Sequence, residues 1–450
     1  MEDKYRISRW CKHFVKNNTM ALFHSISLAV IFVPEETGKL ILSQHLEGLS
    51  EDLIKPLVQE KLIVPVSYNE MDELIGVRNR LLNEISLEMM YLILTDCCNL
   101  RCIYCFEDSP SAPPDFKGTF MSSEIAQKAL RKFSVLTKKH GNSNKRKIIQ
   151  LYGGEPLLNP ELVYKIILDI GKLKKEGDIP ADCIVAIITN GMVMSEDMAR
   201  FLVANKVNVG ISIDGPRDLN NLYRISENAG MDVFERAKSS YCLLKQFGVN
   251  AGISVTLTPE VIKNSDAVLD FFLEDLRVRE GISFNILHFS PAFPVGLEYF
   301  KASSKFLINA FEKLRIAGIY EERMMRKAQA FIDRETMYAD CGVIGNQIVV
   351  APDGRVGVCQ DFIKSKQYFG GSVLDDDYDP VFSGLFEDWK KRSPLFMEKC
   401  FDCEALGICG GGCPASVELK TGNRWNIDER VCYHSKDALE WLIWDAFSQI

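Results

Sequence analysis

Short apolar runs of five to eight residues recur between about residues 90 and 290, and most of them are rich in β-branched side chains. Runs of this kind predict buried β-strands. The segments between them have the spacing of amphipathic helices. In one of them Asn159 is a candidate N-cap and Pro160 occupies the favoured first helical position. The expected strands are 90–94, 147–151, 183–189, 207–213, 250–257 and 282–287.

Six strands that alternate with helices predict an α/β fold with a parallel sheet, arranged as a partial (β/α)6 TIM-like barrel. Polar or glycine-rich segments follow four strands in succession: a cysteine group after the first, GGEP after the second, TNG after the third and DGP after the fourth. In β/α barrels the chemistry takes place at the carboxyl ends of the strands. These four segments are therefore expected to converge on one site.

The pattern changes on both sides of this region. Alternating apolar residues between 26 and 32 predict a strand, and segment 49–65 predicts a helix interrupted near Pro56 and then a short strand. Together they predict a small winged-helix-like module over residues 1–85. The other expected domains are the barrel at 86–300, a helical connector at 301–340 and a cysteine-rich domain at 341–450.

Composition narrows the class of protein. The chain has 450 residues, of which 47% are hydrophobic and 25% charged, as in soluble globular proteins of two or three domains. Its start has no signal-peptide pattern, and no run of about 18 apolar residues follows, so a cytoplasmic protein without a membrane partner is expected. The formal net charge of -8 argues against nucleic acid as a partner.

Fourteen cysteines need a reason in a cytoplasmic protein, because disulfides are rarely kept there. Metal binding or catalysis is the better interpretation. Isolated cysteines are usually small core residues, and this is the expectation for Cys11, Cys97, Cys183 and Cys242. The remaining ten fall into two groups: Cys98, Cys102 and Cys105, and then Cys341, Cys359, Cys400, Cys403, Cys409, Cys413 and Cys432.

The first group has the spacing C-x3-C-x2-C in a short loop after the first expected strand. Zinc sites usually have four ligands, whereas iron-sulfur clusters take thiolates at such close spacings, and three ligands leave one iron free. A zinc knuckle is the alternative. This motif in this position resembles the radical SAM superfamily. The resemblance implies a 4Fe-4S cluster whose open iron binds S-adenosylmethionine (SAM), which is cleaved to a 5′-deoxyadenosyl radical that abstracts hydrogen.

Further residues match the SAM-binding pattern of that superfamily. The resemblance places Tyr104 near the adenine and the GGEP segment near the methionine amino group, where a carboxylate suits an ammonium. Asn220 and Asn221 stand where relatives often have His and Asp. The cofactor-binding residues that the resemblance implies are Tyr104, Gly153, Gly154, Glu155, Pro156, Ser212 and Arg224.

The second cysteine group resembles the SPASM extension of radical SAM enzymes, which carries two auxiliary 4Fe-4S clusters. That resemblance implies one cluster with only three cysteine ligands, so an open iron, or an oxygen ligand such as Asp340 or Glu335, is a hypothesis. Zinc remains the alternative metal. The implied ligand sets are Cys400, Cys403, Cys409 and Cys432 for one cluster, and Cys341, Cys359 and Cys413 for the other.

SPASM enzymes mostly modify peptides. The resemblance implies a maturase that installs a thioether, carbon-carbon or ether cross-link in a ribosomally synthesised (RiPP) precursor peptide. Residues 1–85 resemble, more loosely, the region that binds the precursor's leader by adding a strand. The implied partners are that precursor and an external electron donor of the flavodoxin or ferredoxin type.

Two alternatives remain. Anaerobic sulfatase-maturing enzymes, which make formylglycine, carry an Asp directly after the cysteine that matches Cys359. Here Gln360 follows and Asp361 comes one place later, which is expected to point the carboxylate elsewhere. A non-enzymatic iron-sulfur electron-transfer protein is the second alternative. His288, at the end of the sixth strand, and Asp361 are candidates to handle a proton.

Overall fold

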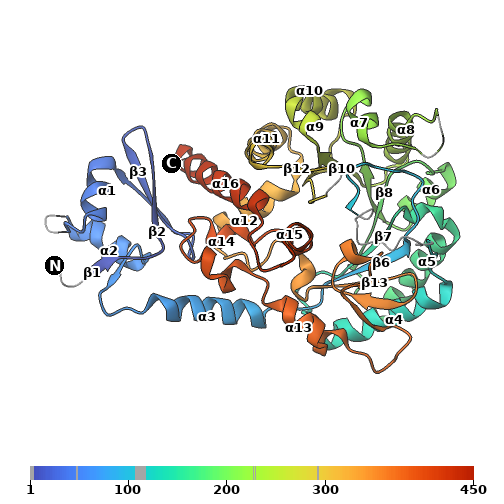
Figure 1. The fold of residues 1–450 in the computed structure, drawn as a ribbon, viewed down its shortest axis with the longest axis horizontal. Coiled ribbons are helices and arrows are strands. Elements are labelled where there is room, and N and C mark those ends of the chain that lie inside the picture. The colour runs from blue at the N-terminus through green and yellow to red at the C-terminus, as the bar shows by residue number, and fades with distance from the viewer. Residues whose placement is uncertain are drawn as a thin grey trace.

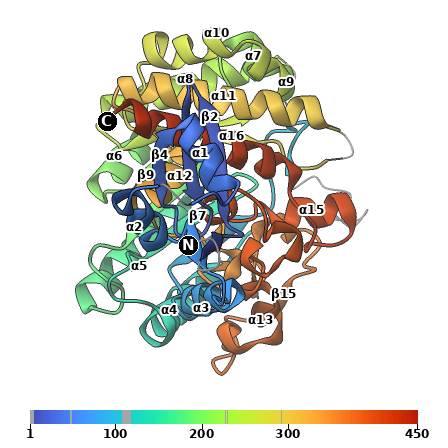
Figure 2. The ribbon, with the colours of Figure 1, turned by 90° about the vertical axis from the view of Figure 1, so that its left-hand side faces the viewer.

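The computed structural model describes residues 5–46, 49–106, 118–226, 228, 230–290 and 293–449. Its regions lie in a row (Figure 1). The N-terminal module is at one end, a large sheet with its helices is at the other, and the cysteine-rich C-terminal region lies between them. Figure 2 shows the N-terminal module in front of the rest of the molecule.

Within the described residues the large sheet has ten strands, and eight of them run parallel. Only the last two in the spatial order, β14 and β15, are antiparallel to their neighbours. The expected α/β class with a mostly parallel sheet is therefore confirmed, and all six expected strands are present. In spatial order the strands are β12 (Tyr320–Glu321), β11 (Gly281–Ile286), β10 (Ala251–Leu257), β9 (Asn208–Ser212), β8 (Ile184–Thr189), β7 (Ile148–Gly153), β6 (Met89–Thr95), β13 (Gln347–Val350), β14 (Arg355–Gly357) and β15 (Phe369–Ser372).

Two parallel strands lie outside the six predicted units. β12 is only two residues long, which gives no periodic signal. β13 follows at Gln347, far along the chain, yet it pairs in parallel with β6 through a register that matches Val350 with Leu92. The sheet therefore continues from the expected barrel region into the cysteine-rich region.

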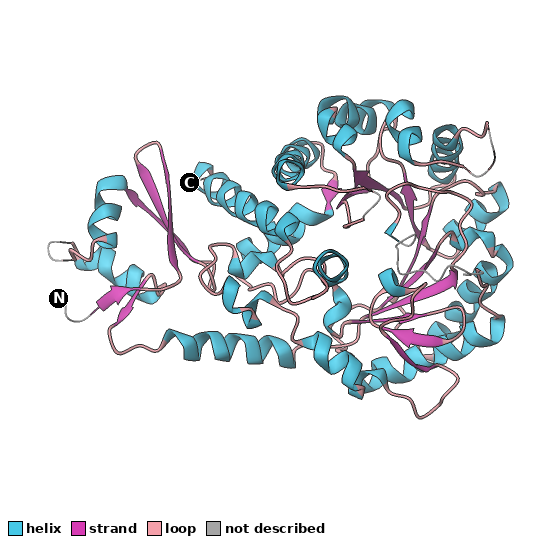
Figure 3. Cartoon of the chain, viewed as in Figure 1, coloured by secondary structure: helices cyan, strands magenta, loops and turns pink. Residues whose placement is uncertain are grey.

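Helices cover the sheet (Figure 3). Hydroxyl and carboxylate side chains cap several of them: Ser122 accepts from the backbone N–H of Ile125, and Asp232 accepts from that of Glu235. Helix α5 begins at Pro160 as predicted. These helices are α4 (Ser123–His140), α5 (Pro160–Glu176), α6 (Glu196–Ala204), α7 (Arg217–Tyr223), α8 (Val233–Gln246), α9 (Pro259–Lys263), α10 (Ser265–Asp270) and α11 (Leu297–Ile316), with short η2 (Pro156–Leu158) and the π-helix η3 (Phe271–Asp275).

The N-terminal module differs in detail from its prediction. Ile26 and Leu28 do not lie in a strand but in the turn between β3 and β4, where Leu28 has a φ of 59°. Helix α2 runs through Pro56 without interruption. The elements of the N-terminal module are β1 (Tyr5–Ile7), β2 (Cys11–Lys16), β3 (Thr19–His24), β4 (Val30–Pro34), α1 (Glu35–Leu42), α2 (Glu51–Gln59), β5 (Ile63–Pro65) and α3 (Glu70–Asn83).

The N-terminal module shares a core with the C-terminal region. The rings of Phe23 and Phe331 stack with their centroids 6.2 Å apart, and Leu28 packs in the same cluster as Ile408 and Leu439. This apolar contact fixes the module against the C-terminal helices. These are α12 (Glu322–Asp333), α13 (Gly384–Lys390), α14 (Leu406–Cys409), α15 (Pro414–Thr421) and α16 (Glu429–Ser448), with short turns η4 (Gly342–Ile344), η5 (Gln360–Phe362), η6 (Pro380–Phe382), η7 (Pro394–Phe396) and η8 (Glu398–Cys400).

Within the described residues, no helix has the length and the apolar run that crossing a bilayer requires.

Candidate active site

The first cysteine group lies in the loop that follows β6. Backbone N–H groups of Arg101 and Ile103 donate to the carbonyls of Ile225 and Tyr223, at 2.7 and 3.0 Å. These two carbonyls flank Arg224. The pairing therefore fixes the cysteine loop beside the segment that follows β9 and α7.

A cavity of about 1450 Å³ opens at the carboxyl ends of the strands. Its size exceeds the usual range of about 300–1,000 Å³ for small-molecule sites. Three of the four polar segments, namely the cysteine group, GGEP and TNG, line it as predicted. The DGP residues are not among its lining residues, and Asp214 instead contacts Arg224, which does line it. Pro156 does not reach the cavity and instead begins the buried turn η2. The predicted site residues that line the cavity are Cys98, Cys102, Tyr104, Cys105, Gly153, Gly154, Glu155, Ser212, Arg224, His288 and Asp361.

The two glycines after β7 are required by close backbone approach. A Cβ on Gly153 would lie 2.2 Å from the carbonyl oxygen of Thr95, and one on Gly154 would lie 2.2 Å from that of Cys97. Gly154 N–H also donates to Thr95 O at 2.9 Å, and Glu155 N–H to Cys97 O at 2.8 Å. The GGEP segment therefore pairs directly with the start of the cysteine loop.

The Glu155 side chain is fully buried and fully hydrogen-bonded. One carboxylate oxygen accepts from Thr189 Oγ1 and Leu157 N–H, at 2.7 and 3.0 Å, and the other from Asn190 N–H at 2.7 Å. Burial raises the pKa of Glu155 to about 7, although these donors oppose the shift. The side chain therefore holds the ends of β7 and β8 together. These three donors leave acceptor capacity on the carboxylate, which lines the cavity.

Replacing Glu155 with Gln should change both pH dependence and SAM binding. Because the folded pKa is raised from 4.5 to about 7, this group makes folding less favourable as pH rises from about 4.5 to 7, by at most roughly 3 kcal/mol. Glu155→Gln should remove that slope. It should also weaken SAM binding, since a Gln NH₂ would face a backbone N–H in either orientation. Chemical denaturation between pH 5 and 7 and SAM titration check this.

Glu321 provides the matched control. It is also fully buried, burial raises its pKa to about 7, and it accepts only from backbone N–H groups at the start of α12. It does not line the cavity. Glu321→Gln should flatten the pH dependence of stability in the same way and leave SAM affinity unchanged. Equal loss of SAM affinity in both variants would contradict a local role for Glu155.

Asp214, from the DGP segment, joins two predicted SAM contacts and was missed in the sequence. Its carboxylate accepts two bonds from Arg224, at 2.9 and 3.0 Å, one from Thr256 N–H at 2.8 Å and one from the Tyr104 hydroxyl. Burial alone would lower the pKa of Arg224, but Asp214 raises it well above its ordinary value. The only signal in the sequence was an acidic residue at the end of an expected strand.

Asn220 and Asn221 have a structural role at the positions where relatives often have His and Asp. Asn220 Oδ1 accepts from the backbone N–H of Asp214 at 3.0 Å. Asn221 donates to Asp232 at 2.7 Å and accepts from Phe234 N–H at 2.8 Å. The pair therefore holds the end of β9 against the start of α8.

In the C-terminal region, two groups of cysteines lie close enough to affect each other's ionisation. A hydrogen bond to Cys409 and then burial, with the charges of Cys400 and Cys403, raise the pKa of Cys432. Burial raises the pKa of Cys359, to which Asp361, Cys413 and Cys341 add. The hydrogen bond with Cys432 conversely lowers the pKa of Cys409 to about 6. Sulfur-rich groups of this kind suit a thiolate-bound metal centre such as an iron-sulfur cluster.

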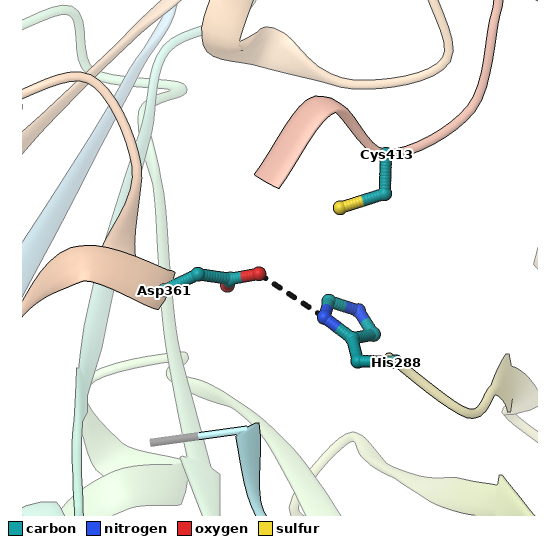
Figure 4. A group of neighbouring side chains, drawn as sticks. All are labelled: His288, Asp361 and Cys413. Atoms are coloured by element: carbon teal, nitrogen blue, oxygen red, sulfur yellow. Dashed lines mark ion pairs between the residues drawn. The ribbon is translucent and has the colours of Figure 1, made fainter. Parts of the chain in front are cut away.

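His288, Asp361 and Cys413 form a compact group between the sheet and the C-terminal region (Figure 4). One ligand atom from each lies within 4.8 Å of the others. His288 Nδ1 is 3.1 Å from Asp361 Oδ2, but neither atom makes a hydrogen bond within the described part of the chain. Asp361 lines the cavity together with Gln360, and its carboxylate points at His288.

Asp340 and Glu335, the oxygen ligands hypothesised for the set of Cys341, Cys359 and Cys413, lie in different environments. Asp340 forms an ion pair with Arg326 at 3.1 Å, and Glu335 is exposed to solvent. Neither position favours a role as a cluster ligand.

Comparison with known proteins gives the following matches. Residues 92–272 match the model of the Radical SAM superfamily. The radical SAM cyclopropyl synthase TigE of Paramaledivibacter caminithermalis is 25% identical over 452 residues, which cover 92% of this chain and 90% of that protein. A cysteine-type anaerobic sulfatase-maturating enzyme of Clostridium perfringens is 27% identical over 372 residues, covering 76% of this chain and 93% of that protein.

Solved structures share the fold. Native anSMEcpe with bound AdoMet superposes with a TM-score of 0.65 at 22% identity, covering 81% of this chain and all of that one. SuiB of Streptococcus suis bound to the precursor peptide SuiA gives a TM-score of 0.57 at 14% identity, covering 95% of this chain and 99% of that one.

Proposed function

Because this chain is a radical SAM enzyme, with the family's domain at residues 92–272, we propose that it matures a ribosomally synthesised precursor peptide by installing a cross-link. The link is a thioether, carbon-carbon or ether bond. The substrate partner is the precursor, and an external flavodoxin or ferredoxin supplies electrons.

The observation that carries this proposal is the cavity of about 1450 Å³. Its wall runs from the first cysteine loop and the SAM-contact residues to His288 and Asp361, beside the second cysteine group. This volume is larger than a nucleoside cofactor alone requires. The remaining space would admit a peptide segment between the SAM site and the wall at His288 and Asp361, which lie next to Cys413.

The chain's own residues would hold three 4Fe-4S clusters and SAM. Cys98, Cys102 and Cys105 would hold the first cluster, and the C-terminal cysteine sets the two auxiliary clusters. When bound, the first cluster and SAM supply a 5′-deoxyadenosyl radical. Arg224 and Tyr104, fixed by Asp214, would orient SAM, and the backbone of Gly154 would face its amino group.

The N-terminal module is proposed to bind the precursor's leader. Its three-stranded sheet has the order β2-β3-β4, so within the described residues β2 has no strand on its outer side. β2 carries Lys12, His13 and Lys16, which suit an acidic peptide. An added strand would pair with the outward backbone groups of β2. The cyclopropyl synthase relative covers 92% of this chain, against 76% for the sulfatase-maturating one, which supports a role for regions beyond the catalytic fold.

Val15→Pro should weaken precursor binding at least tenfold. The loop of Asn17 and Asn18, with φ of 50° and 60°, makes Lys16 and Thr19 the hydrogen-bonded pair next to the turn, so the N–H of Val15 faces outward. Proline removes that donor without breaking the β2–β3 ladder. Fluorescence titration with labelled precursor measures the effect.

Val15→Ala keeps the N–H and serves as its control, with binding close to wild type. SAM cleavage should be unaffected in both variants. Equal binding by the proline variant would contradict strand addition at β2. Deleting residues 1–85 is a poorer test, because it would expose the apolar core that Phe23 shares with Phe331.

A sulfatase-maturing activity is the second candidate. It is favoured by the 27% identity to the Clostridium enzyme and by the position of Asp361 on the cavity wall. Mass spectrometry of treated peptides separates the two. A cross-link removes two hydrogens and leaves no aldehyde, whereas formylglycine formation from cysteine removes sulfur and yields an aldehyde. If the aldehyde is the sole product and no cross-link forms, the maturase proposal is excluded.

The first experiment is anaerobic reconstitution with iron counting and a SAM-cleavage assay under strong reductant. Wild-type protein should hold about twelve irons per chain. The Cys98, Cys102, Cys105 triple Ala variant should hold about eight and produce no 5′-deoxyadenosine. Zinc in place of iron, or cleavage by the variant, would overturn the proposal at its first step.

A further inference from the structure

The auxiliary set of Cys341, Cys359 and Cys413 has only three cysteine ligands for a cluster, and the geometry points to His288 as the fourth ligand. We propose that the His288 imidazole ligates the auxiliary cluster of Cys341, Cys359 and Cys413 through Nε2, with Asp361 fixing the ring through Nδ1. This inference rests on the proposed function, because it concerns a cluster proposed there.

The backbone on both sides of His288 is attached to the region that carries Cys413. On one side, Arg430 donates to the carbonyl of Leu287. On the other, the N–H of Phe289 donates to Ser416 Oγ at 2.8 Å. His288 is therefore fixed next to the loop that leads into α15, although it comes from the end of a sheet strand.

The same network places Cys413. Asp428 accepts two bonds from Arg430, at 2.9 and 2.7 Å, and one from the backbone N–H of Cys413 at 2.9 Å. The Cys413 sulfur in turn accepts from Ser416 N–H at 3.4 Å. Ser416 therefore contacts both the backbone next to His288 and the Cys413 sulfur, and Arg430 joins the same two segments through Leu287 and Asp428. These contacts set the position of the imidazole relative to the sulfur.

Asp361 completes the arrangement from the third side. It lies two residues after Cys359 and is 5% exposed, and its Oδ2 lies 3.1 Å from His288 Nδ1. Figure 4 shows the Asp361 carboxylate pointing at the imidazole, with the Cys413 side chain on a third side of the group. A carboxylate on one ring nitrogen and a metal on the other is the usual arrangement of a metal-ligating histidine.

The test uses full-length reconstituted enzyme without SAM, prepared with nitrogen-15-labelled or unlabelled histidine. Pulsed electron paramagnetic resonance of the reduced clusters should detect a histidine nitrogen coupling that changes with the isotope. His288→Ala should lose that coupling and, on oxidation, yield a 3Fe-4S signal. His288→Cys should lose the coupling, keep about twelve irons and lower the reduction potential of one cluster.

His140→Ala is the matched control, because His140 is also paired with an aspartate, Asp379 at 2.7 Å, but on helix α4. It should retain the coupling. Asp361→Asn should keep the iron and alter the coupling constant, as expected for a positioning residue.

About twelve irons without a histidine coupling would overturn the ligand assignment alone and would favour the proton-handling role expected from the sequence. Fewer than about twelve irons in wild-type protein would overturn the three-cluster proposal as well. A coupling that survives in His288→Ala would assign it to another of the six histidines and overturn the inference.

Discussion

Gly154→Ala should abolish SAM cleavage. The new Cβ would lie 2.2 Å from the carbonyl oxygen of Cys97, 2.5 Å from its carbon and 3.0 Å from the backbone nitrogen of Cys98. The carbonyl cannot retreat without breaking its bond from Glu155 N–H. The loop must therefore shift at the first cysteine. Because a displacement of about 1 Å in a catalytic site can cost about 100-fold, 5′-deoxyadenosine formation should fall at least that far.

The same variant should lose the first cluster, with iron falling from about twelve to about eight per chain. Gly171→Ala is the control, since Gly171 lies inside α5 with nothing within 4 Å of an added Cβ. Alanine is preferred there by about 1 kcal/mol, so that variant should be fully active and slightly more stable. A Gly154→Ala protein with twelve irons and full activity would show that the loop has more room than its contacts indicate.

Much of the catalytic fold could be predicted because its signals are local. Each of the six strands is a short apolar run, and the polar segments follow the strands directly, so their convergence follows from parallel topology. The division of the C-terminal cysteines into two ligand sets came from the resemblance to the SPASM extension and stays a prediction. β12 and β13 were missed because a two-residue strand has no periodicity, and because pairing of Val350 with Leu92 joins distant parts of the chain.

The site could not be predicted where a side chain's role depends on what else is buried. Glu155 was expected to face the SAM amino group, and its further role of joining β7 to β8 through Thr189, Leu157 and Asn190 gave no signal in the sequence. Asp214 was overlooked because its partner Arg224 is ten residues away and was assigned to SAM alone. Ile26 and Leu28 alternate as a strand would, yet their burial comes from a turn that packs on the C-terminal region.

Asp214→Asn should be among the most destabilising isosteric changes in this chain. Arg224 is buried and would keep its charge without a carboxylate, while the new amide would face a donor from either Arg224 or Thr256. Removing one partner of a buried pair costs about 3–5 kcal/mol. SAM affinity should also fall, because Tyr104 and Arg224 lose their common anchor. Chemical denaturation and SAM titration measure the two effects.

Asp445→Asn is the control that tests whether the loss of stability in Asp214→Asn comes from the burial of the ion pair or from its hydrogen-bond geometry. Asp445 accepts two bonds from Arg315, at 2.8 and 2.9 Å, which closely matches the Asp214–Arg224 geometry. In this surface pair, however, the Arg315 side chain is 44% exposed and that of Asp445 24%. Water can solvate the guanidinium once the carboxylate is gone, so the loss should be at most about 1 kcal/mol, with SAM binding unchanged. Similar losses in both variants would mean that Arg224 is solvated in solution, and that Asp214 does not hold the SAM contacts in place.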